Sequence, residues 1–555
     1  MKRSAGEWER RAEGSYKTEA LAPIITVLKN LWTAKKENNM RTENSIRNSL
    51  FAMVGQMLSV LMGFVTRTIF ISILGDEYLG LNGLFASVLS LLSLTELGIG
   101  TAIAFALYKP IAERDEEKIC ALMIFYKKAY RIIALLTAVF GLLLLPFLDA
   151  ITNDVSKTVP HVPVIYLLFL TNTVSSYFFS YKRTLITANQ MHYLNTANES
   201  ICMFSQYILQ IVILKLTHNY ILYLAVQLVC VFLSNVAISR KADRLYPFLK
   251  KYKKAKLDRE TLGMMKTNIL SMLFHRLGSV MVTGTDNIII AQISVAILGL
   301  YSNYTLVITT LATILSQAFN AVTASVGNLI VLENREKQFE TYHNIYFLNF
   351  WIFGFFAVAL SQTVEPFIAL CFGAQRVLSS GVLYLMLINF FLNGMRLSNI
   401  LVINAAGLFK QIKYKSFVEA IINLVVSLYF MIGLDMGIYG VLLGTTVSIV
   451  TTNLWWEPYV IFKHTFKEAL WRYFVKYGFY SAAVLVSFFI SKFLCGFLPG
   501  DGWLNWIFRG VVSSLVPNIV FILLFFRTRQ FQYVRGLLLS YVQKFIKKKN
   551  SGSVQ

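Results

Sequence analysis

Charged residues are scarce in this sequence, and long apolar runs stand in their place. Only 15% of the 555 residues are charged, whereas 56% are hydrophobic and the mean hydropathy is +0.57. Soluble globular domains carry about 25% charged residues, so the composition excludes an ordinary soluble protein. A transmembrane helix needs roughly 20 mainly apolar residues. Such runs recur from Ile46 to Phe526, which predicts a multi-pass membrane protein.

Several features of enzymes and metalloproteins are also missing. The sequence has no Gly-rich phosphate loop and no long soluble segment, both of which a membrane glycosyltransferase would need. Its five cysteines have no metal-ligand spacing and lie mostly in apolar runs, which is typical of packing residues. They are Cys120, Cys202, Cys230, Cys371 and Cys495. We therefore predict a protein that is not an enzyme and that has no metal site and no cofactor.

The apolar runs predict about 14 transmembrane helices. Each run is about twice the length of a barrel strand and lacks apolar/polar alternation, which favours helices over a β-barrel. The predicted fold class is an all-α polytopic membrane protein. The helices are expected to begin near residues 46, 78, 122, 162, 196, 219, 264, 296, 342, 379, 415, 437, 472 and 503.

Loop charge predicts the orientation, because short cytoplasmic loops of bacterial inner-membrane proteins collect Lys and Arg. The loops after even-numbered helices are basic, above all Ser239 to Glu260 and Phe409 to Lys415, whereas the other loops hold acids such as Asp154 and Asp501. Both termini are therefore expected in the cytoplasm, in the plasma membrane of a bacterium. This asymmetry and attraction to anionic lipid account for the net charge of +23 without nucleic acid.

The N-terminal region does not have the pattern of a cleavable signal peptide. The first long apolar run follows a polar, basic stretch, which is the wrong order for a signal peptide. The apolar patch from Ala20 to Trp32 is too short to span a bilayer. We expect a cytoplasmic extension, with Met40 as an alternative start of the protein.

An internal repeat is the most informative pattern in the chain. Four segments recur at an offset between 217 and 220 residues. They are "YLGLNGLF" (Tyr78 to Phe85) with "ILGLYSNY" (Ile297 to Tyr304), "ERDEEK" (Glu113 to Lys118) with "ENREKQ" (Glu333 to Gln338), "TANQ" (Thr187 to Gln190) with "NAAG" (Asn404 to Gly407), and Glu199 with Glu419. The repeat predicts two pseudo-symmetric six-helix lobes around a central cavity, related by an axis along the membrane normal, with two extra C-terminal helices.

The repeat and the charge pattern together divide the chain into segments. The predicted segments are a cytoplasmic extension (1–45), an N-lobe with helices 1 to 6 (46–239), a basic cytoplasmic linker (240–262), a C-lobe with helices 7 to 12 (263–465), helices 13 and 14 (466–527), and a basic cytoplasmic tail (528–555).

Ionisable residues inside the apolar runs indicate a functional interior. Arg67 lies within "GFVTRTIFISILG", and the repeat places Asp286 at the equivalent position. A charge at a helix centre costs about 2.5 to 3.5 kcal/mol, so it normally faces a water-filled or protein-lined interior. The two residues are expected either to line a cavity or to pair with each other as a structural contact. Arg396 has no equivalent charge near Phe179 in the first half, which favours a role in binding.

Polar residues at helical spacing extend this interior to other helices. The predicted cavity residues are Arg67, Arg276, Arg396, Asn393 and Gln317, and the predicted sites for a coupling ion are Asp286 and Glu96.

The segment "FISILGDEYLGLNGLFASVLSLLSLTELGIGTAIAFALYKPIAERDEEKI" (Phe70 to Ile119) resembles the polysaccharide flippases of Gram-positive bacteria. These belong to the multidrug/oligosaccharidyl-lipid/polysaccharide exporter superfamily. The resemblance implies two lobes around a cationic cavity that opens alternately to either side, and an undecaprenyl-pyrophosphate-linked oligosaccharide as cargo. Such a protein would have this cargo, membrane lipids and a coupling H⁺ or Na⁺ as its partners, and we expect a monomer.

The chemistry of the cavity residues fits this cargo, because arginines bind phosphate groups with several donors and stay protonated when partly desolvated. Two alternatives remain. A multidrug antiporter of the same superfamily would favour acids over arginines in the cavity. A membrane-embedded polysaccharide polymerase or ligase usually has a large extracytoplasmic loop, whereas no outer loop here exceeds about twenty residues.

Overall fold

A computed structural model describes residues 55, 59–93, 99–152, 155, 158–189, 191–252, 255–258, 262–263, 284–498, 500, 502–536 and 539. Helices make up nearly all of these residues, and none of them is in a strand. The predicted all-α class is confirmed. Arg276, Glu96, Asp154 and Asp501 lie outside the described residues.

The first half of the described chain forms the N-terminal bundle. Its helices are Ser59–Leu74, α3 (Asp76–Leu92), α4 (Ile99–Glu113), α5 (Glu116–Leu143), α6 (Leu148–Thr152), α7 (Val162–Ala188), α8 (His192–Thr217) and α9 (Tyr220–Leu245).

The second half forms the C-terminal bundle. It consists of a helix over residues 284–293, α11 (Val295–Leu332), α12 (Arg335–Phe372), α13 (Ser380–Met395), α14 (Leu397–Ala406), α15 (Phe409–Ile412), α16 (Lys415–Leu428), α17 (Ile438–Ser448), α18 (Leu454–Ile461), α19 (Trp471–Gly496) and α20 (Trp503–Phe525). Three π-helical turns extend α16, α17 and α18, namely η6 (Tyr429–Gly433), η7 (Ile449–Asn453) and η8 (Phe462–Phe466).

Eleven helical segments in the described part of the chain are long and apolar enough to cross a membrane. Three further predicted helices coincide with shorter described pieces, namely Ser59–Leu74, α3 with α4, and the helix over residues 284–293. The protein is therefore a multi-pass membrane protein, with helices where the apolar runs predict them.

Side-chain caps explain where several helices begin. The Asp115 carboxylate accepts a hydrogen bond from the Lys118 N–H at 2.9 Å, and the Asn334 side chain accepts one from the Lys337 N–H at 2.9 Å. Such caps satisfy N–H groups that have no partner within the helix. The two caps lie in the repeated "ERDEEK" and "ENREKQ" segments, at the same offset as Tyr78 and Ile297.

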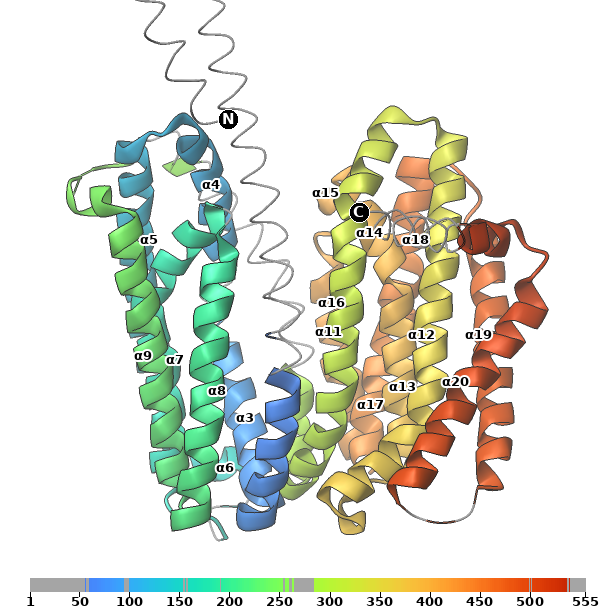
Figure 1. Ribbon diagram of the computed structural model, residues 1–555, viewed down its shortest axis with the longest axis horizontal. Coiled ribbons are helices and arrows are strands. Elements are labelled where there is room, and N and C mark those ends of the chain that lie inside the picture. Colours follow the sequence, from blue (N-terminus) through green and yellow to red (C-terminus); the bar gives the residue numbers. More distant parts are fainter. Residues whose placement is uncertain are drawn as a thin grey trace, which may run out of the picture.

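The two bundles lie side by side, with α3 of the N-terminal bundle packed along α11 of the C-terminal bundle (Figure 1). Two glycines allow this close crossing. A Cβ atom on Gly80 would overlap the backbone of Val295, and one on Gly299 would overlap the backbone of Asp76. Asp76 and Val295 have the same sequence offset as Gly80 and Gly299, so the crossing is symmetric. This symmetry agrees with the predicted repeat, while the segment boundaries stay predictions.

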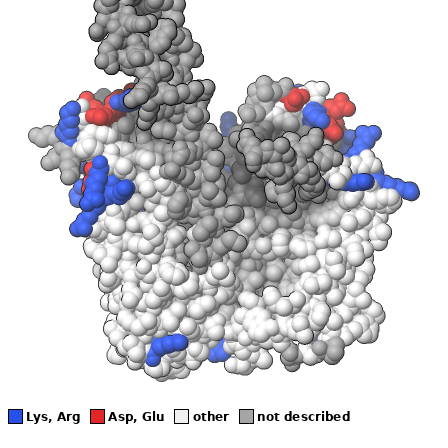
Figure 2. All heavy atoms as spheres, viewed as in Figure 1, with Lys and Arg blue, Asp and Glu red and all other residues white. Residues whose placement is uncertain are grey.

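Charged side chains are concentrated at one end of the molecule. Lys, Arg, Asp and Glu gather in the upper part of the view, and few are visible at the lower end (Figure 2). We call the upper end the basic end, which includes residues 407–414. We call the opposite end, around Gly75, Ser294 and Gly373, the junction end. That the basic end faces the cytoplasm stays a prediction.

Candidate functional site

Arg67 reaches from the N-terminal bundle to the C-terminal bundle. It lies eight residues before Gly75, about 12 Å along the helix from the junction end. Its Nε donates a hydrogen bond to Asn303 Oδ1 of α11 at 2.7 Å, and its Nη2 donates to Ser302 Oγ. Both partners are neutral. Among the described residues, no carboxylate forms an ion pair with this half-buried guanidinium.

The partners of Arg67 are themselves held in place. Asn303 is fully buried, and Ser302 Oγ donates to the Gly299 carbonyl at 2.7 Å. Both residues follow Gly299 within one helical turn, so the α3–α11 crossing sets their position. The guanidinium is therefore oriented by neutral acceptors, while its charge stays uncompensated within the described part of the protein.

Asp286 is a second uncompensated charge, and it belongs to the C-terminal bundle. Only 9% of the residue is exposed. Thr445 of α17 donates a hydrogen bond to Asp286 Oδ2 at 2.8 Å, and Asn423 of α16 donates to that threonine at 3.0 Å. Asp286 Oδ1 has no partner among the described residues. A buried acceptor without a partner is costly and therefore needs an explanation.

Arg67 and Asp286 lie at equivalent depths but do not pair with each other. Asp286 is eight residues before Ser294, just as Arg67 is eight residues before Gly75. Arg67 contacts α11, whereas Asp286 contacts α17. The structure therefore does not contain an ion pair between Arg67 and Asp286, which was one of the two predicted alternatives.

Arg396 differs from the sequence-based expectation. It lies between α13 and α14, where its Nη2 is 2.7 Å from Glu457 Oε1. Lys415 Nζ is 2.7 Å from the same oxygen, and Glu419 lies within 3.8 Å of the Arg396 guanidinium. Acids from α16 and α18 therefore compensate Arg396, which its lack of an equivalent charge in the first half did not predict. Asn393 accepts a hydrogen bond from Arg396 Nη1 at 2.9 Å.

This buried cluster contains residues that the sequence reasoning did not identify as partners. Lys415 belongs to the basic segment predicted as a loop, yet it is 3% exposed at the start of α16. Glu457 is 1% exposed within an otherwise apolar run. Asn453 accepts from Lys415 at 2.6 Å and donates to Glu419 at 2.5 Å. In the sequence, the repeat match between Glu199 and Glu419 is the one pattern that points to a residue of this cluster.

The N-terminal bundle contains a related ion pair. Arg183 of α7 pairs with Glu199 of α8, and its Nη2 donates to Asn235 of α9 at 2.9 Å. Glu199 is the repeat equivalent of Glu419, and Asn235 lies at a closely similar offset from Asn453. In each bundle an acid at the equivalent position, Glu199 on α8 and Glu419 on α16, thus pairs with an arginine outside its own helix.

The structure says less about the other predicted site residues. Gln317 is exposed on α11 and forms no hydrogen bond to a described residue. Because Arg276 and Glu96 fall outside the described residues, their roles stay predictions, as does the central cavity that they would line.

The junction end links the two bundles through several contacts. Arg376 Nε donates to Asp76 Oδ1 at 2.8 Å, and Gln292 Nε2 donates to the Ile151 carbonyl at 3.0 Å. Phe64 packs edge-on against Phe367 of α12 with ring centroids 5.4 Å apart. The Arg376–Asp76 ion pair and the Gln292 hydrogen bond close the junction end, and Arg67 lies on their basic-end side. Phe64 lies about one helical turn farther from the junction end than Arg67.

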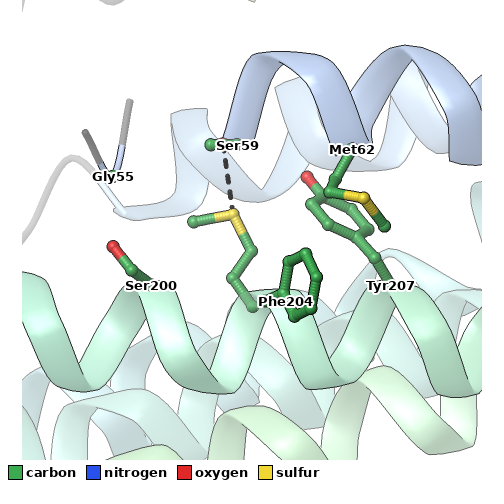
Figure 3. Close-up of a pocket in the computed structure, with 7 residues that line it drawn as sticks. Gly55, Ser59, Met62, Ser200, Phe204 and Tyr207 are labelled. Carbon is green, nitrogen blue, oxygen red and sulfur yellow. Dashed lines mark hydrogen bonds between the residues drawn. The ribbon is translucent and has the colours of Figure 1, made fainter. Parts of the chain in front are cut away.

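A small pocket between helix Ser59–Leu74 and α8 is too narrow for a substrate (Figure 3). Its volume of about 10 Å³ is near that of one water probe. Ser59 Oγ donates to Met203 Sδ at 3.2 Å across it, and Tyr207 closes one side. The pocket is a packing contact inside the N-terminal bundle.

Comparison with known proteins identifies the fold. No protein family and no curated protein matches this sequence. The chain is similar in structure to the lipid II flippase MurJ in an inward closed conformation, with 16% identity and a TM-score of 0.58 over 87% of this chain and 100% of that one. It is also similar to an inward-facing multidrug resistance MATE family transporter of the MOP superfamily, with 18% identity and a TM-score of 0.55 over 75% of this chain and 98% of that one. The chain therefore has the fold of these membrane transporters.

Proposed function

We propose that the protein is a flippase for an anionic lipid-linked oligosaccharide. It would move an undecaprenyl-pyrophosphate-linked oligosaccharide from the cytoplasmic to the outer leaflet by alternating access, for cell-surface polysaccharide assembly. The observation that supports this most is the uncompensated Arg67 charge between the two bundles. Similar folds include a lipid II flippase, which is consistent with a lipid-linked cargo. On this proposal the protein is a transporter and not an enzyme.

The geometry of Arg67 suits a phosphate ligand. Its Nε and Nη2 are held by Asn303 and Ser302, while its Nη1 has no partner among the described residues. The guanidinium is thus fixed in a plane with donors left for a ligand. A pyrophosphate has to cross about 30 Å of hydrocarbon, so a protonated group along the path lowers the barrier.

The other cavity residues take supporting roles in this proposal. Asn393 and Gln317 would hydrogen-bond sugar hydroxyls, and Arg276 would add a second charge near the pyrophosphate. Because Arg396 is neutralised by Glu457, we assign it to orienting Asn393 as well as to the cavity wall.

Asp286 is our proposed site for the coupling ion. One of its oxygens has no partner among the described residues, and Thr445 donates a hydrogen bond to the other. Binding of H⁺ or Na⁺ would neutralise a carboxylate that otherwise remains buried without a counterion. Glu96 is a second proposed ion site. An ion that binds one conformation more tightly than the other shifts the equilibrium between them, which is what coupling requires.

A multidrug antiporter is the second candidate, and Asp286 favours it. A buried carboxylate without a counterion can hold a cationic drug as well as a small ion. One of the structurally similar proteins is a multidrug resistance transporter. A polysaccharide polymerase or ligase is not favoured by any residue cluster in the described part of the chain.

A transport assay with the purified protein separates these candidates. Vesicles containing the full chain receive either a fluorescent undecaprenyl-pyrophosphate oligosaccharide or a cationic dye. We expect the lipid-linked sugar to become accessible to an impermeant quencher on the far side, and the dye to stay where it was added. Transport of the dye alone would assign the protein to the antiporters.

A further inference from the structure

An apolar groove crosses the face of the N-terminal bundle formed by α5, α7 and α9. Its volume is about 590 Å³, within the range of small-molecule sites. Its lining includes Leu142 of α5, seven residues of α7 and Phe232 of α9. Among the seven are Leu167, Val174, Phe178 and Phe179. We call this surface the α7 groove.

Close packing forms the floor and one wall of the α7 groove. Gly141 of α5 lets Leu170 of α7 approach closely, and Tyr166 donates a hydrogen bond to the Gly141 carbonyl at 2.9 Å. On the other side, Phe179 and Phe232 pack edge to face with ring centroids 5.6 Å apart. Because these helices span the membrane, whatever fills the groove at this depth is apolar.

The groove ends in a cluster of cations toward the basic end of the same three helices. Arg131 is seven residues before Ala138 on α5, and Lys182 follows Phe178 by one helical turn on α7. Lys127 lies one turn beyond Arg131 and close enough to both cations to repel them. Lys and Arg side chains gather over the upper part of this bundle in Figure 2. We call Lys127, Arg131 and Lys182 the cationic cluster.

The cationic cluster is only partly neutralised. Lys182 Nζ is 2.7 Å from Asp243 Oδ2 and donates to Ser239 Oγ at 2.9 Å. Lys127 and Arg131 are exposed and form no ion pair with a described residue. Three cations therefore face one carboxylate at the mouth of an apolar groove.

We propose that the α7 groove and the cationic cluster together bind an anionic phospholipid of the leaflet at the basic end. An acyl chain fits the apolar groove, and the phosphate fits the excess positive charge above it. A zwitterionic phospholipid also has a phosphate, but its ammonium group would add to the excess positive charge, and a soluble anion would leave the groove empty. The site is distinct from Arg67, which faces α11 of the other bundle.

Native mass spectrometry of the full-length protein tests this proposal with defined lipids. Phosphatidylglycerol and phosphatidylethanolamine with the same acyl chains are titrated onto the delipidated protein. We expect tighter binding of phosphatidylglycerol, and a loss of about tenfold or more in that preference in the double variant Lys127→Gln with Arg131→Gln. The variant Ala138→Trp, which fills the groove and keeps the charges, should lower the affinity for both lipids.

A matched control removes two cations from the same end of the other bundle. Lys410→Gln with Lys413→Gln changes two exposed residues and should leave phosphatidylglycerol binding unchanged. Equal losses in both double variants, or unchanged binding in the first, would overturn the proposal. Displacement of phosphatidylglycerol by equimolar undecaprenyl phosphate would also overturn it, because the groove would then belong to the carrier lipid. Thermal unfolding of each variant confirms that it is folded.

Discussion

Arg376 and Asp76 form an ion pair that joins the two bundles at the junction end. Arg376 Nε lies 2.8 Å from Asp76 Oδ1 and 3.0 Å from Oδ2, and Arg376 Nη1 donates to the Phe372 carbonyl at 2.7 Å. The two residues are 300 positions apart in the sequence. In the alternating-access cycle that we propose, this contact would have to break when the junction end opens, so it would act as a latch.

Removing this latch should favour opening of the junction end. A partly exposed charged pair contributes about 1 kcal/mol, so Arg376→Gln should raise the open population about fivefold. Spin labels at Ala150 and Gln292, which face each other across the bundles, report the change as a longer distance. Arg376→Lys keeps the charge and should shift the distances less. Identical distance distributions in all three proteins would argue against the latch.

The glycine crossing predicts a sharp contrast within one helix. A Cβ atom at Gly80 would overlap the Val295 backbone, whereas one at Gly83 would meet Leu298 at an ordinary 3.8 Å. Gly80→Ala should therefore destabilise the protein by about 1 to 3 kcal/mol, and Gly83→Ala should be nearly neutral. Thermal unfolding in detergent measures both. Equal stability of the two variants would show that the helices do not cross as described.

The buried cluster around Glu457 should be sensitive to the loss of one partner. Glu457→Gln leaves Glu419 as the one described carboxylate beside Arg396 and Lys415, so one buried positive charge is unpaired, which predicts a loss of about 3 to 5 kcal/mol. Adding Lys415→Met removes one stranded cation and should recover part of that stability. As a control, Glu468→Gln breaks an exposed pair with Arg472 and should cost less than about 1 kcal/mol. Membrane abundance and thermal unfolding report these differences, and a fully stable Glu457→Gln would contradict the account.

Loop charge predicts which end faces the cytoplasm. Cysteines that replace Lys251 and Lys413 should react with impermeant reagents only in inside-out vesicles. Cysteines that replace Asp154 and Asp501 should react in intact cells. The opposite labelling would reverse the proposed orientation.

Much of the fold could be predicted from the sequence, because a local apolar run predicts each transmembrane helix. Gly80 and Gly299 lie in matched segments of the repeat, but the sequence pattern did not predict that α3 and α11 cross there. The equivalent depths of Arg67 and Asp286 follow from the same offset.

The partners of the charged residues could not be predicted in the same way. Arg396 contacts Glu457 because α14 and α18 pack together. A local sequence pattern does not predict which helices pack together or how each helix is rotated about its axis. Lys415 was assigned to a basic loop because its neighbours in sequence are basic, although its side chain points into the bundle. Arg67 contacts Asn303 and not Asp286 for the same reason, since side-chain direction decides between two helices of similar depth.

The most direct test of the proposed function is the rate at which vesicles containing Arg67→Ala flip a fluorescent undecaprenyl-pyrophosphate oligosaccharide. Charge-assisted hydrogen bonds contribute about 1.5 to 3 kcal/mol each, so the rate should fall at least tenfold at normal protein abundance. Arg67→Lys should be intermediate, because it keeps the charge but loses the planar donors. Since Arg67 and Asp286 do not pair, adding Asp286→Ala should not restore the rate. Wild-type flipping by Arg67→Ala, or full recovery in the double variant, would contradict the role of Arg67 in binding the cargo.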